Sequence, residues 1–415
     1  MSRPQPARGA HAHSEPPVEP SILGVRADRP WPRPQPCAFD TLTTLDEIEP
    51  WRAAWDDLAV RTERPFCSPA WMLTWWRYAA PAGGRLRVIV AREGPRLVGV
   101  APLFVVRGRG RPSRYRVLGA GTGMRAEPLA HPGEEARAGA AFARALGAAS
   151  PRPGLILFEG VPTSSPWPRL LAAALPGHRG PWTHVDVTRP APTLRLTGRT
   201  FDEWLAGQSR NFRGQMRRAR RQLDEAGAVI RVADSEGVGM ERDIRAFARL
   251  HHARWDWRGG SAVLDARIER MLVEAASRLG PLRFRLWLIE VEGLAISAHL
   301  FVCAGGEVAY WLGGFDEAWA RQRPAMVALL RSVEHAFASG DHRVDFGGGD
   351  QPYKYRFADG EDLLAWVTLV PRDRRYLAAR AGLLPRQAYR MLSDRLSEDA
   401  QERIRTIAST LGPRR

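Results

Sequence analysis

The stretch FRLWLIEVEGLAISAHLFVC (residues 284–303) carries the pattern that decides the fold. Two apolar runs flank a turn at Glu292-Gly293, which predicts a β-hairpin. An earlier stretch, LRVIVAREGPRLVGVAPLFVV (86–106), repeats this plan and ends in a similar apolar string. Helical sequence precedes both hairpins. We therefore predict a duplicated mixed α/β (α+β) unit, with one copy over residues 39–190 and the other over 191–371.

The segments around the two hairpins have the periodicity of helices and strands. Ser68 and Pro69 predict the start of a helix over residues 68–79, as N-cap and first helical residue. Gly227 predicts the end of a helix that begins at residue 201. Further helices are expected over 51–60, 241–257 and 326–340, a strand over 307–317, and a last strand with a glycine loop over 342–350.

Length and composition predict a globular protein with two domains. The chain has 415 residues, of which 44% are hydrophobic, and single cores rarely grow to that size. Residues 1–38 are expected to be disordered, because nine prolines crowd the first 36 positions. No run of about 18 apolar residues predicts a membrane span, and no signal peptide is recognisable. Three widely spaced cysteines indicate neither disulfides nor zinc, which favours the cytoplasm.

The net charge of +16 is concentrated in a few segments. Residues 208–223 hold six arginines and no acid, and residues 372–415, predicted to be a helical tail, hold eleven arginines against five acids. The rest of the chain is close to neutral. Such a distribution favours a phosphate-bearing partner at a defined place. Three arginines that flank the apolar stripe of the predicted helix are candidates for binding this partner: Arg213, Arg217 and Arg220.

A second candidate phosphate site lies where the strand at 307–317 leads into the next helix. Gly313-Gly314 predicts a break that would expose backbone N–H groups, as a β-bulge does. Arg321 and Arg323 come just before Pro324, and the helix that follows presents a partly positive N-terminus with Ala325 in its first turn. Together these groups predict a pyrophosphate site. The backbone N–H groups from Leu312 to Gly314 are also candidates for stabilising an oxyanion.

Lys354 is the only lysine among 61 basic residues and lies within GGGDQPYKYRF (347–357). Lysine is a compact charge whose pKa shifts on burial, whereas arginine is a planar fork that stays charged. Lys354 is therefore either a site residue or a leftover on a solvated loop. Asp345 ends the last strand and is a candidate general base, or else the partner of an arginine. His299 is expected to be a satisfied strand histidine, and His251 and His252 lack the further ligands of a metal site.

Several of these segments resemble a known family. RQRPAM (321–326) resembles the coenzyme A pyrophosphate loop of GNAT acyltransferases, although Pro324 and Met326 replace its small residues. Over residues 39–371 the chain is similar to the bacterial CelD/BioF2-like GNAT group, and to the FemAB-like tandem-GNAT transferases related to it. The segments that carry this resemblance are QSRNFRGQMRRARRQL, LHHARWDWRGGS, AYWLGGFDEAWARQRPAMVALL and VDFGGGDQPYKYRF.

The resemblance implies two tandem GNAT-like domains and an N-acyltransferase whose catalytic cleft lies in the second domain. It implies acetyl-CoA or another acyl-CoA as donor, and Lys354 as a catalytic residue that lies in the cleft and supports transfer, with Tyr353 as the aromatic wall. No metal is expected, because His251 and His252 lack further ligands. The acceptor, an amine or hydroxyl on a small molecule or cell-envelope precursor, stays open, as does the oligomeric state. One alternative is a FemAB-like transferase with aminoacyl-tRNA as donor. Another is a nucleic-acid or anionic-polymer binding protein without catalysis.

Overall fold

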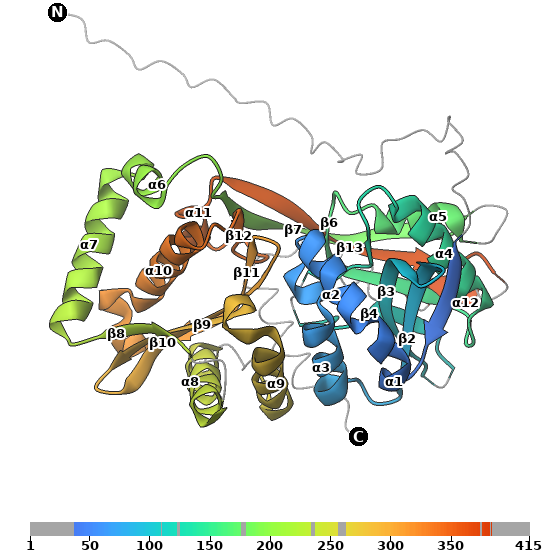
Figure 1. Ribbon diagram of the computed structural model, residues 1–415, viewed down its shortest axis with the longest axis horizontal. Helices are drawn as coiled ribbons and strands as arrows, with labels where there is room; N and C mark the ends of the chain where they lie inside the picture. Colours follow the sequence, from blue (N-terminus) through green and yellow to red (C-terminus); the bar gives the residue numbers. More distant parts are fainter. Residues whose placement is uncertain are drawn as a thin grey trace, which may run out of the picture. The chain divides into compact units, whose positions relative to one another are not determined.

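The structure is a computed structural model that describes residues 37–108, 110–122, 125–175, 180–233, 237–255, 263–373, 376–381 and 383. Within this part of the chain, one thirteen-stranded sheet has the order β1-β2-β3-β4-β6-β13-β7-β12-β11-β10-β9-β8, and β5 pairs with β3 (Figure 1). The strands are β1 (Ala38–Leu42), β2 (Gly84–Glu93), β3 (Arg96–Val106), β4 (Arg114–Val117), β5 (Leu129–Ala130), β6 (Leu155–Pro162), β7 (Trp182–Arg195), β8 (Val229–Val232), β9 (Phe284–Val291), β10 (Leu294–Ala304), β11 (Glu307–Phe315), β12 (Arg343–Asp345) and β13 (Gly360–Val370).

The predicted duplication is confirmed by the way the strands are connected. Each half has an edge strand, then helices, an antiparallel hairpin, a further antiparallel strand, a crossover helix and a parallel strand. The predicted hairpins are β2–β3 and β9–β10, and the parallel pairs are β4–β6 and β11–β12. The helices of the first half include α2 (Arg52–Arg61), α3 (Pro69–Ala79) and α4 (Glu135–Ala148), and those of the second include α8 (Gly237–Trp255), α9 (Ala266–Arg283) and α10 (Pro324–Ala338).

Two long strands join the halves. β7 pairs with β12 of the second half, and β13, which follows β12 in sequence, pairs with β6 of the first half. β7 and β13 also pair with each other over eleven residues. The expected domain boundary between residues 190 and 191 falls inside β7. The sheet is continuous through this strand, and the division into two domains stays a prediction.

Helices cover the sheet because their apolar stripes match its buried positions. α3 begins at the predicted N-cap, where Ser68 Oγ accepts the backbone N–H of Trp71. The α3 helix packs on α9 of the other half. Trp71 also meets Trp311 of β11 edge-on, with ring centroids 5.4 Å apart. These aromatic rings belong to one buried cluster that includes residues of both halves.

A second helical layer covers the opposite face of β10 and β11. The predicted helix over 201–227 is two helices, α6 (Phe201–Gly207) and α7 (Arg210–Glu225). The chain breaks between them because Gln208 adopts an extended conformation and Ser209 then caps α7 by accepting the N–H of Phe212. The apolar stripe of α7 and the side chains of α10 are buried in the clusters on this face. α7 and α10 therefore lie side by side above the sheet (Figure 1).

Both expected terminal segments fall mostly outside the described residues. Of the predicted disordered segment, only residues 37 and 38 are described, and of the predicted basic tail chiefly α12 (Tyr376–Ala381). No helix in the described part of the chain is long and apolar enough to span a bilayer.

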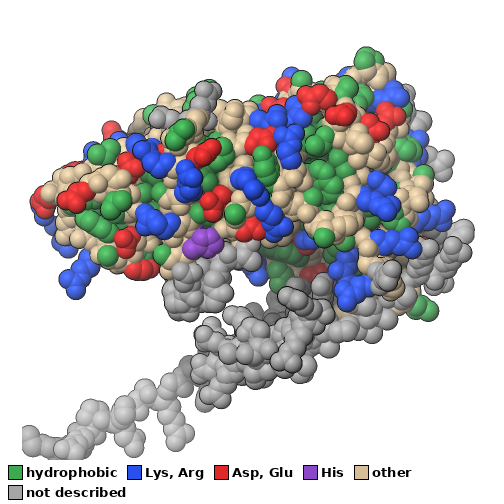
Figure 2. Space-filling model, turned by 90° about the horizontal axis from the view of Figure 1, so that it is seen from below, with side chains coloured by type: hydrophobic (Ala, Val, Ile, Leu, Met, Phe, Trp, Pro, Cys, Tyr) green, Lys and Arg blue, Asp and Glu red, His purple; other side chains and the backbone are tan. Residues whose placement is uncertain are grey.

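Basic and acidic side chains are interspersed on the face of the body seen in Figure 2. Ion pairs such as Arg77–Glu274 and Arg278–Glu274 are part of this pattern. The folded body thus balances many of its arginines locally. The arginines of α7 are the contrast: among the described residues only Arg221 has a carboxylate partner there, Glu225 at 3.5 Å.

Candidate functional site

The parallel strands β11 and β12 separate shortly after they meet. They pair only from Glu307–Arg343 to Ala309–Asp345, where β12 ends, while β11 continues to Phe315. Beyond Ala309, the edge of β11 that faces β12 is therefore no longer paired with β12. A turn of three glycines, Gly347–Gly349, follows β12 close by, since a Cβ atom on Gly347 would lie 3.1 Å from the carbonyl oxygen of Tyr310.

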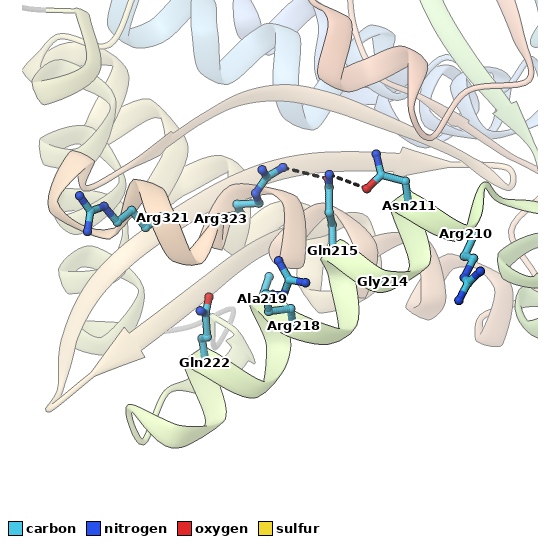
Figure 3. A pocket seen from close by; sticks show the side chains of 9 residues that line it. All are labelled: Arg210, Asn211, Gly214, Gln215, Arg218, Ala219, Gln222, Arg321 and Arg323. Atoms are coloured by element: carbon cyan, nitrogen blue, oxygen red, sulfur yellow. Dashed lines mark hydrogen bonds between the residues drawn. The ribbon is translucent and has the colours of Figure 1, made fainter.

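A basic pocket of about 710 Å³ lies between α7 and the segment that leads into α10. Figure 3 shows side chains from both elements around it. Arg321 and Arg323 come from the segment before α10, and Arg210 and Arg218 come from α7. The remaining lining residues are Asn211, Gly214, Gln215, Ala219 and Gln222. The pocket contains four guanidinium groups and no carboxylate, so it favours an anion.

Two cations are held beside each other at this pocket by one amide. Arg323 Nη1 and Arg356 Nη2 both donate to Gln215 Oε1, at 3.0 and 2.8 Å. Burial lowers the pKa of Arg356, and the charge of Arg323 lowers it further. Neither arginine forms an ion pair with a carboxylate in the described residues. An anionic ligand would offset this repulsion, because phosphates accept charge-assisted hydrogen bonds from arginine.

The N-terminus of α10 adds a backbone donor. Met326 and Val327 donate their N–H groups to the carbonyl of Arg323, and Pro324 has none, which leaves the N–H of Ala325 in the first turn. The N-cap Arg323 has φ 53° and ψ 47°, the left-handed region that favours glycine. A non-glycine residue there is costly, and such strain occurs often at ligand sites.

Of the arginines predicted to bind phosphate, Arg321 and Arg323 line the pocket. Arg213, Arg217 and Arg220 lie on α7 but not among the residues that line it. Arg213 instead donates to the carbonyl of Ala206. Sequence reasoning missed Arg210 and Arg218, although a signal existed. Positions 210, 214, 218 and 222 recur at intervals of four, which places them on one face of a helix.

Lys354 is buried, so the alternative of a solvated loop lysine is wrong. Its side chain is on the short helix α11 (Pro352–Tyr355) and the residue is 4% exposed. Its Nζ donates to the carbonyls of Gly347 and Gly348, at 3.0 and 2.9 Å. The ammonium thus holds the glycine turn at the place where β11 and β12 separate. Neighbouring Tyr353 packs against the aromatic cluster under α7.

Asp345 has the arginine partner that was the alternative to a base. Its Oδ2 lies 2.8 Å from Arg125 Nε, and its Oδ1 accepts the N–H of Gly347 at 2.8 Å. The residue is 2% exposed. Both oxygens are occupied in this arrangement, and proton transfer by Asp345 stays a prediction.

The predicted break at Gly313-Gly314 is wrong. Both residues lie within β11 and pair with His299 and Ala298 of β10. The irregularity in register lies between Tyr310 and Leu312 of β11, opposite Leu300 and Phe301 of β10. The glycines serve close packing: a Cβ on Gly314 would lie 2.4 Å from the carbonyl carbon of Leu250 in α8. The oxyanion role of the backbone from Leu312 to Gly314 stays a prediction.

His299 is a satisfied strand histidine, as expected. It is 1% exposed, and its ring nitrogens lie 3.1 Å from Ser297 Oγ and 3.3 Å from Tyr310 Oη. A Cβ on Gly313 would collide with both the imidazole and the phenol. Among the described residues, no group of three or more His, Cys, Asp or Glu side chains is arranged to hold a metal ion.

Sequence reasoning also missed Glu307, the first residue of β11. Burial raises the pKa of its carboxyl from 4.5 to about 7, while Arg343, 3.4 Å away, acts in the opposite direction. The charge of Asp345 raises it further, and those of Arg125 and Arg64 lower it. No local sequence pattern indicates this raised pKa, because its main cause is the burial of Glu307 in the folded chain.

The raised pKa of Glu307 predicts a loss of stability as pH rises. The folded state holds this proton up to about pH 7, whereas the unfolded chain loses it near 4.5, so unfolding becomes easier between these values. At roughly 1.4 kcal/mol per pKa unit the loss reaches about 3 kcal/mol. Glu307→Gln keeps the shape and removes the titration. Urea unfolding at pH 5 and pH 8 should show a smaller difference for this variant than for the wild type; equal differences would contradict the assignment.

The comparisons with known proteins agree with this geometry. Residues 210–355 match the sequence model described as an acetyltransferase (GNAT) domain. The second half carries a GNAT domain. The match begins at the first residue of α7 and ends one residue after Lys354, so it includes the basic pocket, β11, α10 and the glycine turn. No curated protein matches the chain.

Solved structures share the fold at low sequence identity. The crystal structure of FemX superposes with a TM-score of 0.55 at 14% identity, covering 80% of this chain and 97% of that one. The C-terminal domain (DUF2156) of a putative lysylphosphatidylglycerol synthetase from Agrobacterium fabrum gives 0.52 at 12% identity, covering 81% and 96%. Both alignments extend beyond the GNAT domain to the first half. The likeness is therefore one of the whole tandem arrangement, and at this identity it is a likeness of fold.

Proposed function

We propose that the protein is an N-acyltransferase that moves an acyl group from coenzyme A to an amine or hydroxyl acceptor. The basic pocket carries this proposal. It gathers Arg321 and Arg323, next to the N-terminus of α10, with arginines of α7, and all of them fall within the residues that match the GNAT domain model. The phosphates of coenzyme A match four guanidiniums and a helix N-terminus that have no carboxylate of their own.

The residues of this chain fit the donor in named roles. Arg321, Arg323 and the N–H of Ala325 would hold its phosphates, and Arg210 and Arg218 would close the pocket from α7. The nucleophile of the acceptor attacks the thioester carbonyl, a C–N or C–O bond forms, and the C–S bond breaks. The nucleophile loses a proton and the leaving thiolate takes one up. Lys354 acts by fixing the backbone of Gly347 and Gly348 rather than by meeting the phosphates.

Arg323→Ala should weaken donor binding by about 10- to 100-fold, because one charge-assisted contact and its share of the pocket's field are lost. Isothermal titration with acetyl-CoA measures the change. Arg217→Ala is the matched control: it removes an exposed arginine of α7 that does not line the pocket. Equal losses in both variants would mean that non-specific charge, not the pocket, binds the donor.

The first experiment is a thermal-shift panel with acetyl-CoA, longer acyl-CoAs and desulfo- or dephospho-analogues. A ligand that binds the native state raises the melting temperature. We expect a shift with acyl-CoA that shrinks when the phosphates are missing. No shift with any acyl-CoA would sink the proposal of this donor.

A second candidate is supported by the arginines that the pocket does not use. Arg217 and Arg220 are exposed on α7 and have no carboxylate partner in the described residues. A donor larger than coenzyme A, such as an aminoacyl-tRNA, would extend over them. Its binding would weaken steeply with salt, by several powers of ten for 6–10 phosphate contacts between about 50 and 200 mM. Charged tRNA in the same panel separates the two donors. In either case we place the protein in the cytoplasm, where both donors occur.

A further inference from the structure

A segment of the first half reaches into the second half beside the glycine turn. It lies after β4, and its Thr122 carbonyl accepts a hydrogen bond from Trp311 Nε1 of β11 at 3.0 Å. Cys67, next to α3, contacts the carbonyls of Arg125 and Glu127 further along the segment, at 3.8 and 3.5 Å. Thr122 is therefore bound to β11 of the second half, while Arg125 and Glu127 are bound to Cys67 of the first half.

Arg125 is the charged residue of this segment that crosses between the halves. Its side chain is 12% exposed. It lies 2.8 Å from Asp345 through Nε, and Nη1 donates to Asp362 of β13 at 2.8 Å. Arg343 binds the same Asp362. One guanidinium from the first half thus joins two carboxylates of the second, and removing it would leave the buried carboxylate of Asp345 without this cation.

Asp345 connects Arg125 to the glycine turn. With Oδ2 on Arg125, its other oxygen accepts the N–H of Gly347, and Lys354 holds the carbonyls of Gly347 and Gly348 from the other side. The turn is consequently clamped between an anion and a cation. Asp345 is joined to the first half through Arg125, so the orientation of its carboxylate depends on Arg125.

The turn needs this clamp because its backbone is unusual and its space is narrow. Gly347 and Gly349 have φ values of 74° and 113°. Glycine adopts such conformations freely, and it is also free to leave them. The nearby carbonyl of Tyr310 leaves little room beside Gly347. A turn made of three glycines therefore takes a single position only if its neighbours impose it.

We infer that Arg125 is a positioning residue for the site of the second half, acting through Asp345 on the turn at Gly347. The first half then contributes to the reaction without contacting the donor pocket. The functional meaning of this inference rests on the proposed function. The backbone around a binding or catalytic site must be held to within about 0.5 Å by supporting groups. The loss of Arg125 would release the turn while α7 and α10 stay in place.

Hydrogen exchange tests the physical part of the inference, whether or not a substrate is known. In the full chain, Arg125→Met should speed amide exchange in a peptide covering the glycine turn by about tenfold or more, because local opening becomes easier. A peptide from α10 serves as the internal reference and should not change. Arg116→Met is the matched control, since Arg116 pairs with Glu159 inside the first half at 2.7 Å. Unchanged exchange in the turn of Arg125→Met would overturn the inference.

Arg125→Lys covers the case in which the methionine variant does not fold. Lysine keeps a buried cation but lacks the fork that reaches both carboxylates. Exchange in the turn should then be intermediate between wild type and a released turn. Exchange equal to wild type in the lysine variant would count against a role for the two-pronged contact and overturn the assignment.

Transfer kinetics test the functional part. With acyl-CoA as donor, Arg125→Met should lower kcat by about 10- to 100-fold at an unchanged KM for the donor, the signature of an interaction that matters after binding. A wild-type protein that binds no acyl-CoA would refute the proposed donor and leave the exchange result to decide on the clamp. Normal kcat together with faster exchange would show that the clamp has no part in the reaction.

Discussion

Lys354→Met is expected to lower the free energy of unfolding by about 2–3 kcal/mol, because two partly buried backbone carbonyls lose a charged donor at once. Both Gly347 and Gly348 accept from this ammonium within 3.0 Å, and the residue is 4% exposed. Each buried acceptor left without a partner costs about 1–3 kcal/mol. Lys354→Arg should lose a similar amount, since a planar guanidinium does not fit the space of an ammonium. Urea unfolding measures both variants.

Donor binding separates the structural role of Lys354 from a role in the pocket. Lys354 does not line the basic pocket, so acetyl-CoA should raise the melting temperature of the folded variant by the wild-type increment. Tyr355→Phe is the control on the same short helix, since Tyr355 is 43% exposed and its hydroxyl binds the carboxylate of Glu361 at the surface. Loss of acetyl-CoA binding in a folded Lys354→Met protein would show that the lysine contacts the donor.

Gly314→Ala should destabilise the fold by about 3 kcal/mol, because the added methyl group meets backbone and not a movable side chain. Its Cβ would lie 2.4 Å from the carbonyl carbon of Leu250 and 2.5 Å from the nitrogen of His251. Helix α8 must move away from β11 to admit it, and the packing of the helix on the sheet is then lost. Chemical denaturation compares the variant with the wild type.

Gly214→Ala is the matched control for that substitution. Nothing lies within 4 Å of its Cβ position, and the residue is in the interior of α7. Alanine is the better helix former by about 0.8–1 kcal/mol, so this variant should be slightly more stable than wild type. If Gly314→Ala were as harmless as Gly214→Ala, the close contact between α8 and β11 would be refuted.

Features set by neighbours in sequence could be predicted from the sequence. Ser68 and Pro69 mark the start of α3, and the alternating apolar runs around Glu93 and Glu292 mark the two hairpins. The same holds for the basic segment before α10, where Arg321 and Arg323 precede a proline at the first helical position. In each case the residues that decide the structure are a few positions apart.

Features set by distant partners could not be predicted in this way. The contact of Arg125 with Asp345 joins residues 220 positions apart, and nothing near either one indicates it. Gly313 and Gly314 looked like a break because glycine has several uses, and only the positions of α8 and His299 show that they serve close packing. The burial of Lys354 depends likewise on how the glycine turn folds over it.

The exchange of β7 and β13 between the halves has a consequence for how the chain reaches its native state. β13 is separated by about 200 residues from its partner β6, which makes part of the topology strongly non-local. Non-local pairing slows folding, since distant segments must meet before their contacts stabilise anything. During synthesis, one edge of β6 stays unpaired until β13, which ends at Val370, has left the ribosome. A fragment of either half would expose such an edge permanently, and an exposed edge promotes aggregation.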